Sequence, residues 1–274
     1  MKITAATRLA GVVGRPIRQS LSPAIHNAWL GAAGIDAVYL AFEPDGLSEL
    51  VSALRARLVL GLNVTAPFKA EALASADVAS ARAERAGAAN LLTLDGDGAV
   101  LADNTDGEGL LAAFAEQAPG YTPQDGPAAI IGAGGAAAGA ALALLEAGAP
   151  QVRILNRSPA RAADLASYFG ERVSAHDLGE SDAALDGAVA IVNATAVDPA
   201  VSLAAAAPNA IVLDMAYRPV LTPFLRRARA RGLATVDGLA MLIGQARPSF
   251  SALFGVEVPD IDVRAVAIAA MSVP

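Results

Sequence analysis

The sequence contains no cysteine, and this absence excludes three classes of chemistry at once. Disulfide bonds, a thiol nucleophile and a thiolate-ligated metal all require Cys. Histidine is scarce too, because the chain has only His26 and His176, which lie far apart and lack the spacing of metal ligands. We therefore expect no metal site and a cytoplasmic protein.

Positive charge is also in short supply, since 20 Lys and Arg stand against 27 Asp and Glu and give a net charge of −7. An acidic protein repels phosphate backbones, so nucleic acid is not expected as a partner. The N-terminus has Lys2, Arg8 and Arg15 around a brief apolar run, without the sustained apolar segment of a secretory signal. We expect neither nucleic-acid binding nor export.

Charged residues make up only 17% of the 274 residues, whereas 54% are hydrophobic. A chain of this length is too long for one small core and suits two α/β domains. Little charge and many apolar residues fit parallel strands that are buried on both faces. The composition therefore indicates a compact globular protein with two α/β domains.

The most informative motif lies in residues 127–158. A short apolar run ends in Gly132-x-Gly134-x-x-Ala137, which opens an alanine-rich helix. This is the pattern of a dinucleotide-binding turn: the first Gly permits a tight turn, the second lets the backbone approach a pyrophosphate, and the small third residue lets helix and strand pack closely. The N-terminus of the helix then faces the anion.

Two other interpretations of this motif deserve a test. Residues 128–145 are eighteen uncharged apolar or glycine residues in a row, which is about the length of a membrane span. The run is built of Ala and Gly rather than Leu and Ile and lacks flanking Lys or Arg, so we reject a membrane helix. A buried strand-and-helix unit that binds no ligand stays open as the alternative.

The residues after the second strand of this domain select the cofactor. An NAD site usually has an Asp or Glu there, which binds the ribose hydroxyls. The strand at 152–155 is followed instead by Asn156-Arg157-Ser158 and Arg161, and the next acid, Asp164, lies within the following helix pattern. An Arg beside the ribose suits a 2′-phosphate, so the sequence favours NADP(H). The alternative is that both arginines are solvated charges at a helix start.

Two serines stand at the first helix of the chain. Ser22 is expected to be the N-cap, with Pro23 at the first helical position, and this structural role alone would explain it. Ser20 has no such role. Paired hydroxyls at a helix entrance can bind a carboxylate, so both serines are candidates for a ligand site.

Lys69 follows an apolar run that we predict to be a buried strand over residues 58–64. Ligands in open α/β sheets bind at the carboxyl ends of strands, which makes Lys69 a candidate for a functional group. A solvated surface charge is the default for any Lys and stays the alternative. Asp106, at the start of a helix, could likewise be an acid that favours the helix dipole.

Apolar runs and turn residues predict the remaining elements. Strands are expected at 9–13, 38–42, 58–64, 89–94, 99–103, 128–131, 152–155, 189–193 and 210–213. Helices are expected at 22–34, 47–57, up to Ala86, 106–117, 221–232, up to Phe254, and 263–271. Residues 118–127, rich in Pro, Gly and Gln, are predicted to be the linker into the cofactor domain.

These motifs together resemble the shikimate dehydrogenase family, within the shikimate/quinate dehydrogenase superfamily. The resemblance covers nearly the whole chain. It rests on Gly14-x-Pro16-Ile17, Ser20-x-Ser22-Pro23-x-x-His26-Asn27, Asn63-Val64-Thr65-x-Pro67-x-Lys69, Gly87-Ala88-x-Asn90, Asn104-Thr105-Asp106-Gly107, Gly132-x-Gly134-Gly135-Ala136, Asn156-Arg157-Ser158, Asp237-Gly238-Leu239-x-Met241-Leu242 and Gln245-Ala246. Because several independent motifs occur in the family's order, the resemblance is specific.

The resemblance implies an α/β fold with two domains and reduction of 3-dehydroshikimate to shikimate by NADPH, in the pathway to chorismate and the aromatic amino acids. Residues 1–105 would form a substrate-binding domain with an open α/β sheet, and residues 106–238 a Rossmann-like NADP-binding domain. Residues 239–274 would be helical and pack back on the first domain. The sequence leaves open whether the chain acts as a homodimer and which reaction direction dominates.

The resemblance also implies roles for particular residues. Lys69 and Asp106 would be the catalytic pair. The substrate would be bound by Ser20 and Ser22 at its carboxylate and by Thr65, Asn90, Asp106, Tyr217 and Gln245 elsewhere. The cofactor would be bound by Gly132, Ala133, Gly134, Gly135, Ala136, Ala137, Asn156, Arg157, Ser158, Arg161, Thr195 and Gly238.

The sequence departs from the family pattern in three places. Gln19 stands where His is usual, Phe68 where Tyr is common, and Asp198-Pro199 where the family has a Gly-Met that lines the nicotinamide pocket. Alternatives therefore stay open: a quinate/shikimate dehydrogenase that uses NAD, a weakly catalytic homologue that binds the ligand as a regulator, and an unrelated Rossmann oxidoreductase. Activity with 3-dehydroshikimate, measured with both NADPH and NADH, separates these alternatives.

Overall fold

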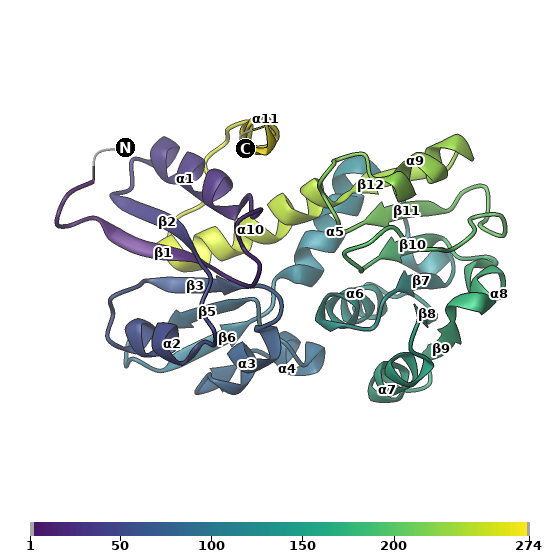
Figure 1. The fold of residues 1–274 in the computed structure, drawn as a ribbon, viewed down its shortest axis with the longest axis horizontal. Helices are drawn as coiled ribbons and strands as arrows, with labels where there is room; N and C mark the ends of the chain where they lie inside the picture. Colours follow the sequence, from purple (N-terminus) through teal and green to yellow (C-terminus); the bar gives the residue numbers. More distant parts are fainter. Residues whose placement is uncertain (1–2, 273–274) are drawn as a thin grey trace. The chain divides into compact units, whose positions relative to one another are not determined.

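The structure of the protein is a computed structural model that describes residues 3–272, and its chain forms two compact units (Figure 1). The first unit consists of residues 1–105 and 245–274, and the second of residues 106–244. The chain thus leaves the first unit once and returns to it within a single helix, α10 (Gly238–Phe254).

The first unit is built on a six-stranded sheet with the order β2-β1-β3-β5-β6-β4. Its strands are β1 (Arg8–Val13), β2 (Ala37–Phe42), β3 (Gly61–Val64), β4 (Val78–Ala79), β5 (Leu91–Leu94) and β6 (Val100–Asp103). Only β5 runs antiparallel to its neighbours, because a tight hairpin joins it to β6. Asp95 closes that hairpin by accepting the N–H groups of Asp97 and Ala99 at 2.9 and 2.8 Å.

Helices surround this sheet: α1 (Ser22–Ala33), α2 (Ser48–Arg55), α3 (Lys69–Ala74), α4 (Ala81–Ala86), the C-terminal part of α10, and α11 (Val263–Met271). The helix α11 packs against α1. An aromatic cluster of His26, Trp29, Tyr39 and Phe250 joins α10 to α1 and β2: His26 contacts Tyr39 and Phe250, and Trp29 and Phe250 are 5.4 Å apart between ring centroids. The C-terminal helices therefore return to the first unit, as the sequence predicted.

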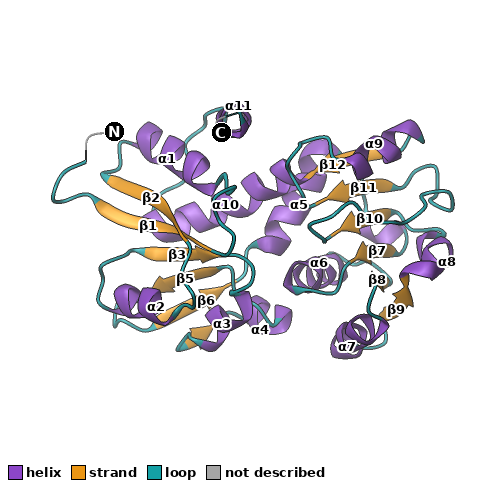
Figure 2. Ribbon diagram, in the orientation of Figure 1, coloured by secondary structure: helices purple, strands orange, loops and turns teal. Residues whose placement is uncertain are grey.

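The second unit has a six-stranded sheet of parallel strands with the order β12-β11-β10-β7-β8-β9 (Figure 2). The strands are β7 (Ala128–Ile131), β8 (Val152–Asn156), β9 (Val173–Asp177), β10 (Ala190–Asn193), β11 (Ile211–Asp214) and β12 (Ala234–Asp237). The helices are α5 (Asp106–Gln117), α6 (Gly135–Glu146), α7 (Pro159–Phe169), α8 (Ser181–Leu185), α9 (Pro223–Ala230) and the start of α10, with short 3₁₀ turns η1 (Pro123–Asp125) and η2 (Leu178–Glu180).

This strand order is that of the doubly wound dinucleotide-binding fold, in which the winding direction reverses between the first and fourth strands of the unit. Here those strands are β7 and β10, which pair directly. The prediction of an α/β protein with a Rossmann-like domain is confirmed.

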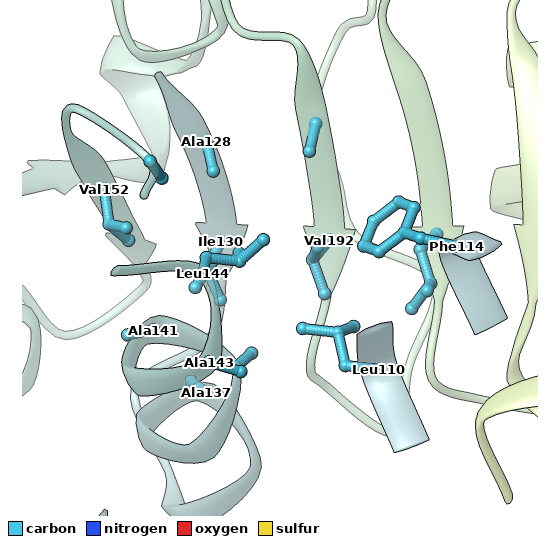
Figure 3. Close-up of a cluster of buried hydrophobic side chains, with 14 of the residues drawn as sticks. Leu110, Phe114, Ala128, Ile130, Ala137, Ala141, Ala143, Leu144, Val152 and Val192 are labelled. Carbon is cyan, nitrogen blue, oxygen red and sulfur yellow. The ribbon is translucent and has the colours of Figure 1, made fainter. Parts of the chain in front are cut away.

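The core of the second unit explains the alanine-rich sequence around α6 (Figure 3). Ala137, Ala141 and Leu144 on α6 are buried in one cluster with Ile130 of β7 and Val192 of β10. Every residue of β7, β10 and β11 is buried, as expected for parallel strands covered on both faces. The uncharged run at 128–145 is therefore a strand and a core helix, and none of the helices between residues 3 and 272 is long and apolar enough to cross a membrane.

Small residues also bring α5 and α6 close together. A Cβ placed on Gly107 would lie 2.9 Å from the Cβ of Ala143, closer than side chains pack. A Cβ placed on Gly139 would lie 3.5 Å from the Cβ of Asp106. The glycines thus let the first turn of α5, which carries Asp106, rest on α6.

The structure corrects the predicted alanine-rich helix that ends at Ala86. The segment instead contains two short helices, α3 and α4, separated by the strand β4. The break has a physical cause at Asp77, whose N–H binds the carbonyl of Val100 at 2.9 Å and whose side chain accepts the N–H of Val100 at 2.8 Å. Ser80 then caps α4 by accepting the N–H of Ala83.

Other boundaries shift as well. The strand predicted at 58–64 begins only at Gly61, since Arg57 has a positive φ of 59° and Leu58 is 70% exposed. The strands β9 and β12, which carry few consecutive apolar residues, were not predicted.

Candidate active site

The directions of the strands in the first unit decide at which edge of its sheet a ligand would bind. We call this the ligand edge. The parallel strands β1, β3 and β6 end at this edge, and the antiparallel β5 begins there. Thr65 follows β3, Asn90 precedes β5, and Thr105 follows β6. Residues from three separate motifs therefore come together at one edge of the sheet, where open α/β folds bind ligands.

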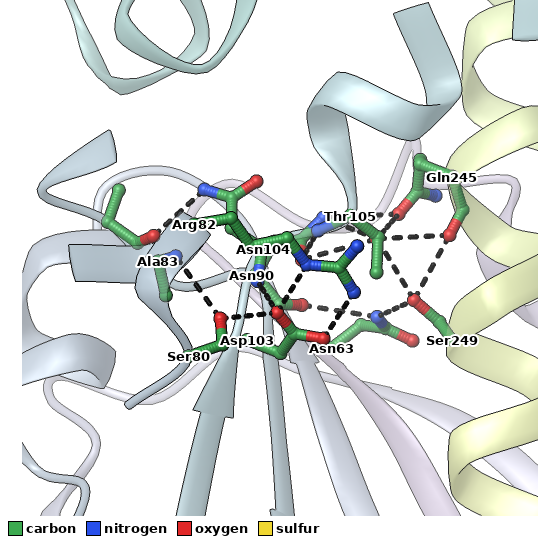
Figure 4. Close-up of polar contacts among 11 residues, drawn as sticks. Asn63, Ser80, Arg82, Ala83, Asn90, Asp103, Asn104, Thr105, Gln245 and Ser249 are labelled. Atoms are coloured by element: carbon green, nitrogen blue, oxygen red, sulfur yellow. Dashed lines mark hydrogen bonds and ion pairs between the residues drawn. The ribbon is translucent and has the colours of Figure 1, made fainter. Parts of the chain in front are cut away.

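A hydrogen-bonded group of Asn90, Thr105 and Gln245 occupies this edge (Figure 4). The N–H of Thr105 donates to Oδ1 of Asn90 at 2.8 Å, and Nδ2 of Asn90 donates to Oγ1 of Thr105 at 3.0 Å and to Oε1 of Gln245 at 3.4 Å. The Thr105 hydroxyl also contacts the carbonyl of Gln245 at 3.1 Å. The structure thus brings together two of the predicted substrate residues, Asn90 and Gln245, and Thr105 orients the Asn90 amide.

A second polar layer, not singled out from the sequence, lies beneath this group. Nδ2 of Asn63 donates to the Asn90 carbonyl at 3.1 Å and to the Ser249 hydroxyl at 2.9 Å. Oδ1 of Asn63 accepts the Tyr39 hydroxyl at 2.8 Å. All of these groups are buried. The signal that could have revealed them is a polar residue within an otherwise apolar strand or helix, since a buried polar group needs a partner.

The ion pair of Arg82 and Asp103 supports the same edge from the other side. The Arg82 guanidinium donates a hydrogen bond to each carboxylate oxygen of Asp103, and the Ser80 hydroxyl donates to one of them at 2.6 Å. The arginine and these hydrogen bonds lower the pKa of Asp103 in spite of its partial burial, which acts in the opposite direction. This anchor immediately precedes Asn104, Thr105 and the start of α5.

The predicted N-cap role of Ser22 is wrong. Ser22 is the first residue of α1, and the N-cap position falls on Leu21, which already has helical dihedral angles and makes no side-chain cap. Ser20 takes the structural role instead, because its hydroxyl accepts the N–H of Ser22 at 3.3 Å. Within residues 3–272 the Ser22 hydroxyl has no hydrogen-bond partner, which leaves it available for a ligand.

The loop that carries both serines is held next to Thr65. Any side chain on Gly14 would clash with Cγ2 of Thr65, so glycine permits this close approach. The N–H of Arg15 binds the carbonyl of Ala66 at 3.0 Å. The serine loop and Thr65 are thereby placed together at the same edge.

Each of the two predicted catalytic residues is the first residue of a helix. Lys69 is the first residue of α3 in the first unit, partly exposed, and its carbonyl accepts the N–H of Ala89 at 2.9 Å. Asp106 is the first residue of α5 in the second unit and is only 7% exposed. Because the two side chains belong to different units, their pairing stays a prediction.

The glycine turn lies at the reversal point of the second sheet. Gly132 has a φ of 118°, and a Cβ added to it would lie 3.1 Å from Cγ2 of Thr195, in the loop after β10. Gly134 is the N-cap of α6 and makes no side-chain cap, and the space next to it is open. The first N–H groups of α6 are thus left without a side-chain acceptor, as a pyrophosphate site requires. Ala133, Gly135 and Ala136 line the turn, and Ala137 is buried against the strand.

The arginines expected to select the cofactor lie beside this turn. Arg157 and Arg161 are exposed and have no ion-pair or hydrogen-bond partner within residues 3–272, whereas Arg153 and Arg172 are bonded to backbone carbonyls. Asn156 ends β8 and donates to the carbonyl of Ser158 at 3.1 Å. A pocket of about 350 Å³ is lined by Ala133, Arg161, Asp164, Leu165 and Tyr168. Arg161, which lines this pocket and has no other partner within residues 3–272, suits a phosphate.

Two further predicted residues lie near the ends of β11 and β12. Tyr217 is partly exposed in the loop after β11. Gly238 starts α10, and any side chain there would clash with the carbonyls of Met215 and Ala216. The structure therefore supplies a packing reason for glycine at position 238. Among the described residues no group of three or more His, Asp and Glu could hold a metal ion.

A doubly wound dinucleotide-binding unit, joined in one chain to a second α/β unit with a polar edge, has the architecture of a two-domain enzyme that binds a dinucleotide cofactor. Residues 12–92 match the model of the shikimate dehydrogenase substrate binding domain, and residues 115–217 match that of shikimate / quinate 5-dehydrogenase. The chain is 51% identical over 275 residues to a shikimate dehydrogenase (NADP⁺) of Caulobacter vibrioides, covering 97% of this chain and 96% of the relative.

Solved structures agree. A shikimate dehydrogenase crystallised with NADP⁺ has a TM-score of 0.88 at 31% identity, covering 99% of this chain and 98% of that one. The Thermus thermophilus enzyme in complex with NADP(H) and shikimate has a TM-score of 0.83 at 35% identity, covering 96% and 99%. The chain belongs to the shikimate dehydrogenase family, which confirms the resemblance seen in the sequence.

Proposed function

We propose that this protein reversibly reduces 3-dehydroshikimate to shikimate with NADPH. The proposal rests on one observation in a chain of this family. Hydrogen-bond donors at the ligand edge of each unit have no hydrogen-bond or ion-pair partner among the described residues. Among residues 3–272, the Ser22 hydroxyl in the first unit and the guanidinium groups of Arg157 and Arg161 in the second are examples of such groups. A carboxylate and a 2′-phosphate are the anions that such donors bind.

The residues present fit NADP(H). The uncapped start of α6 and the open space at Gly134 suit a pyrophosphate, and no acid stands directly after β8, between Asn156 and Arg161, to bind a free 2′-hydroxyl. We assign Gly132, Ala133, Gly134, Gly135, Ala136 and Ala137 to the pyrophosphate, and Asn156, Arg157, Ser158 and Arg161 to the adenosine phosphate. Thr195 and Gly238 complete the cofactor set.

The substrate site is assigned to the first unit. The Ser22 and Ser20 hydroxyls would bind the carboxylate, although Ser20 would have to combine this with its bond to the N–H of Ser22. The remaining substrate residues are Thr65, Asn90, Asp106, Tyr217 and Gln245. Because the Asn90 amide is already oriented by Thr105, it offers a fixed donor and acceptor, and a preorganised site loses less binding energy to the ordering of side chains.

The cofactor supplies the hydride, and the chain supplies the proton and the electrostatics. Hydride arriving at a ketone carbon leaves negative charge on the oxygen. An ammonium at Lys69 Nζ would stabilise this charge and donate the proton, and the Asp106 carboxylate would orient the ammonium and accept a hydrogen bond from the adjacent hydroxyl. The roles of Lys69 and Asp106 are carried over from the family.

We further propose that residues 1–105 bind substrate, that residues 106–238 bind NADP(H), and that residues 239–274 pack back on the substrate domain. A cytoplasmic location and a homodimer stay predictions.

A substrate panel tests the function. The purified protein should oxidise NADPH with 3-dehydroshikimate and reduce NADP⁺ with shikimate, and should be much slower with NADH, NAD⁺ or quinate. Comparable rates with NAD⁺ and quinate would favour the quinate/shikimate alternative. Binding of shikimate without any NADPH oxidation would favour a regulatory homologue, and no response to either substrate would refute the proposal.

A further inference from the structure

The first half of the loop after β10, residues 195–199, is hydrogen-bonded to Asn193, the last residue of that strand. The Thr195 hydroxyl donates to Oδ1 of Asn193 at 2.7 Å, and Nδ2 of Asn193 donates to the carbonyl of Val197 at 3.1 Å. Asn193 is fully buried and also donates to Asp214 at 2.9 Å. The first half of the loop is therefore fixed by a side chain that is itself held in place.

The second half of the loop is held by an arginine from α9. NH1 of Arg227 contacts both carboxylate oxygens of Asp198 at 2.8 and 2.6 Å, and NH2 donates to the carbonyl of Pro199 at 2.8 Å. The guanidinium also lies over the Phe224 ring, 5.5 Å from its centroid. The planar Arg227 guanidinium thus contacts three acceptor oxygens and lies over an aromatic ring. A Lys ammonium could not make the same set of contacts.

This loop forms one wall of the reversal point at which the second unit binds its ligand. Thr195 faces Gly132 across that point, as the 3.1 Å approach to an added Cβ shows. Val197, at the tip of the loop, is 68% exposed although its backbone is tied down. An apolar side chain held in solvent by a fixed backbone is suited to contact a ligand, since a fixed loop loses little entropy when the ligand binds.

We propose that Arg227 and Asp198 are positioning residues that hold the loop 195–199 in the shape that receives the nicotinamide half of NADP(H). This inference rests on the proposed function. It also accounts for the unusual Asp198-Pro199 sequence, because both residues supply acceptors to the same guanidinium. Arg227 acts through the loop and touches neither substrate nor cofactor itself.

The test compares two ligands that share the adenosine 2′-phosphate half, of which only NADPH carries the nicotinamide half that would reach the loop. NADPH extends from the adenosine site to the nicotinamide site, whereas adenosine 2′,5′-bisphosphate fills only the adenosine site. Arg227→Ala and Asp198→Ala should each weaken the affinity for NADPH by roughly 2- to 5-fold, the range expected when a partly exposed ion pair is lost. Affinity for the bisphosphate should be unchanged, and the double variant should be no weaker than either single variant.

Arg226→Ala is the matched control, because Arg226 is exposed on the same helix and its NH1 donates to the carbonyl of Leu221. It should leave both affinities unchanged. Arg227→Lys keeps the positive charge but lacks the planar guanidinium. Its affinity for NADPH should therefore lie between those of Arg227→Ala and the parent protein. If Arg227→Ala fails to fold, Arg227→Lys and Asp198→Asn provide the same comparison.

Unchanged NADPH binding in the variants, or an equal loss of both ligands, would overturn the inference. Because the readout is binding, it does not depend on turnover. A parent protein that binds NADPH but does not reduce 3-dehydroshikimate would refute the proposed function and leave this comparison valid, whereas a parent that does not bind NADPH would overturn both.

Discussion

His26 should make the first unit sensitive to mild acid. Its side chain is 1% exposed, is stacked on Tyr39 with 4.1 Å between ring centroids, and has Trp29 and Phe250 as further neighbours. Nδ1 of His26 is buried without a hydrogen-bond partner in the described part of the chain. Burial lowers the pKa of His26 from 6.5 to about 3, because a charged imidazolium would lose its hydration in this apolar cage.

The sign and size of the effect follow from this shift. The folded state holds His26 neutral, whereas the unfolded state can protonate it. The free energy of unfolding is therefore highest above pH 6.5 and decreases as the pH falls toward 3. At pH 5 the loss is about 2 kcal/mol, since the unfolded chain is then mostly protonated at this position and the folded chain is not. A folded-state pKa about one unit higher would give nearly the same loss in the free energy of unfolding at pH 5.

The assay uses the fluorescence of Trp29, the only tryptophan in the chain, which lies 5.6 Å from His26 between ring centroids. Urea unfolding of the parent and of His26→Phe would be followed from pH 7.5 to 5. His26→Phe keeps a ring against Tyr39 but cannot be protonated, so its stability relative to the parent should rise by about 2 kcal/mol over this range. His176→Gln is the control, because His176 is only partly buried and hydrogen-bonded to Ser174. A stability difference between parent and His26→Phe that does not change with pH would refute the reasoning.

Three further predictions concern the site. Arg157→Ala should raise the KM for NADPH and leave that for NADH nearly unchanged, since each Arg–phosphate contact contributes about 1.5–3 kcal/mol; equal losses with both cofactors would show that Arg157 does not contact the phosphate. Ser22→Ala should weaken shikimate binding with little change in thermal stability, whereas Ser20→Ala should also destabilise the protein by about 1 kcal/mol, and an unchanged KM in both would place the carboxylate site elsewhere. Lys69→Ala should lower kcat by roughly 10²- to 10⁴-fold while NADPH still binds, and a loss of only a few-fold would move the search for the proton donor to Tyr217 or a water.

Local signals in the sequence predicted much of the fold. The glycine turn was predicted because its function requires small residues at fixed spacing, and the structure gives Gly132 the positive φ that the motif implies. The strands β7, β10 and β11 were predicted because full burial demands uninterrupted apolar residues. Such signals depend on neighbours in the chain and can be seen in one sequence.

Elements that depend on distant partners could not be predicted. The strand β4 has only two residues and exists because Asp77 bonds to Val100 on a neighbouring strand. The bond between Asn63 and Ser249 joins residues 186 positions apart. The choice between Ser20 and Ser22 as the stabilising hydroxyl depended on the dihedral angles of Leu21, which the Ser-Pro pattern did not reveal.

The structure adds a distinction among the candidate residues that their identity alone cannot supply. Asn90 already uses its amide oxygen for the N–H of Thr105 and its amide nitrogen for Thr105 and Gln245. The bond between Asn90 and Gln245 is the longest of these, at 3.4 Å, and hydrogen bonds weaken toward this length. A substrate hydroxyl inserted between the two amides would therefore replace this weak contact and keep the strong ones. The Ser22 hydroxyl, by contrast, has no hydrogen bond to another residue in the described range 3–272, so its whole interaction with a carboxylate would count toward binding.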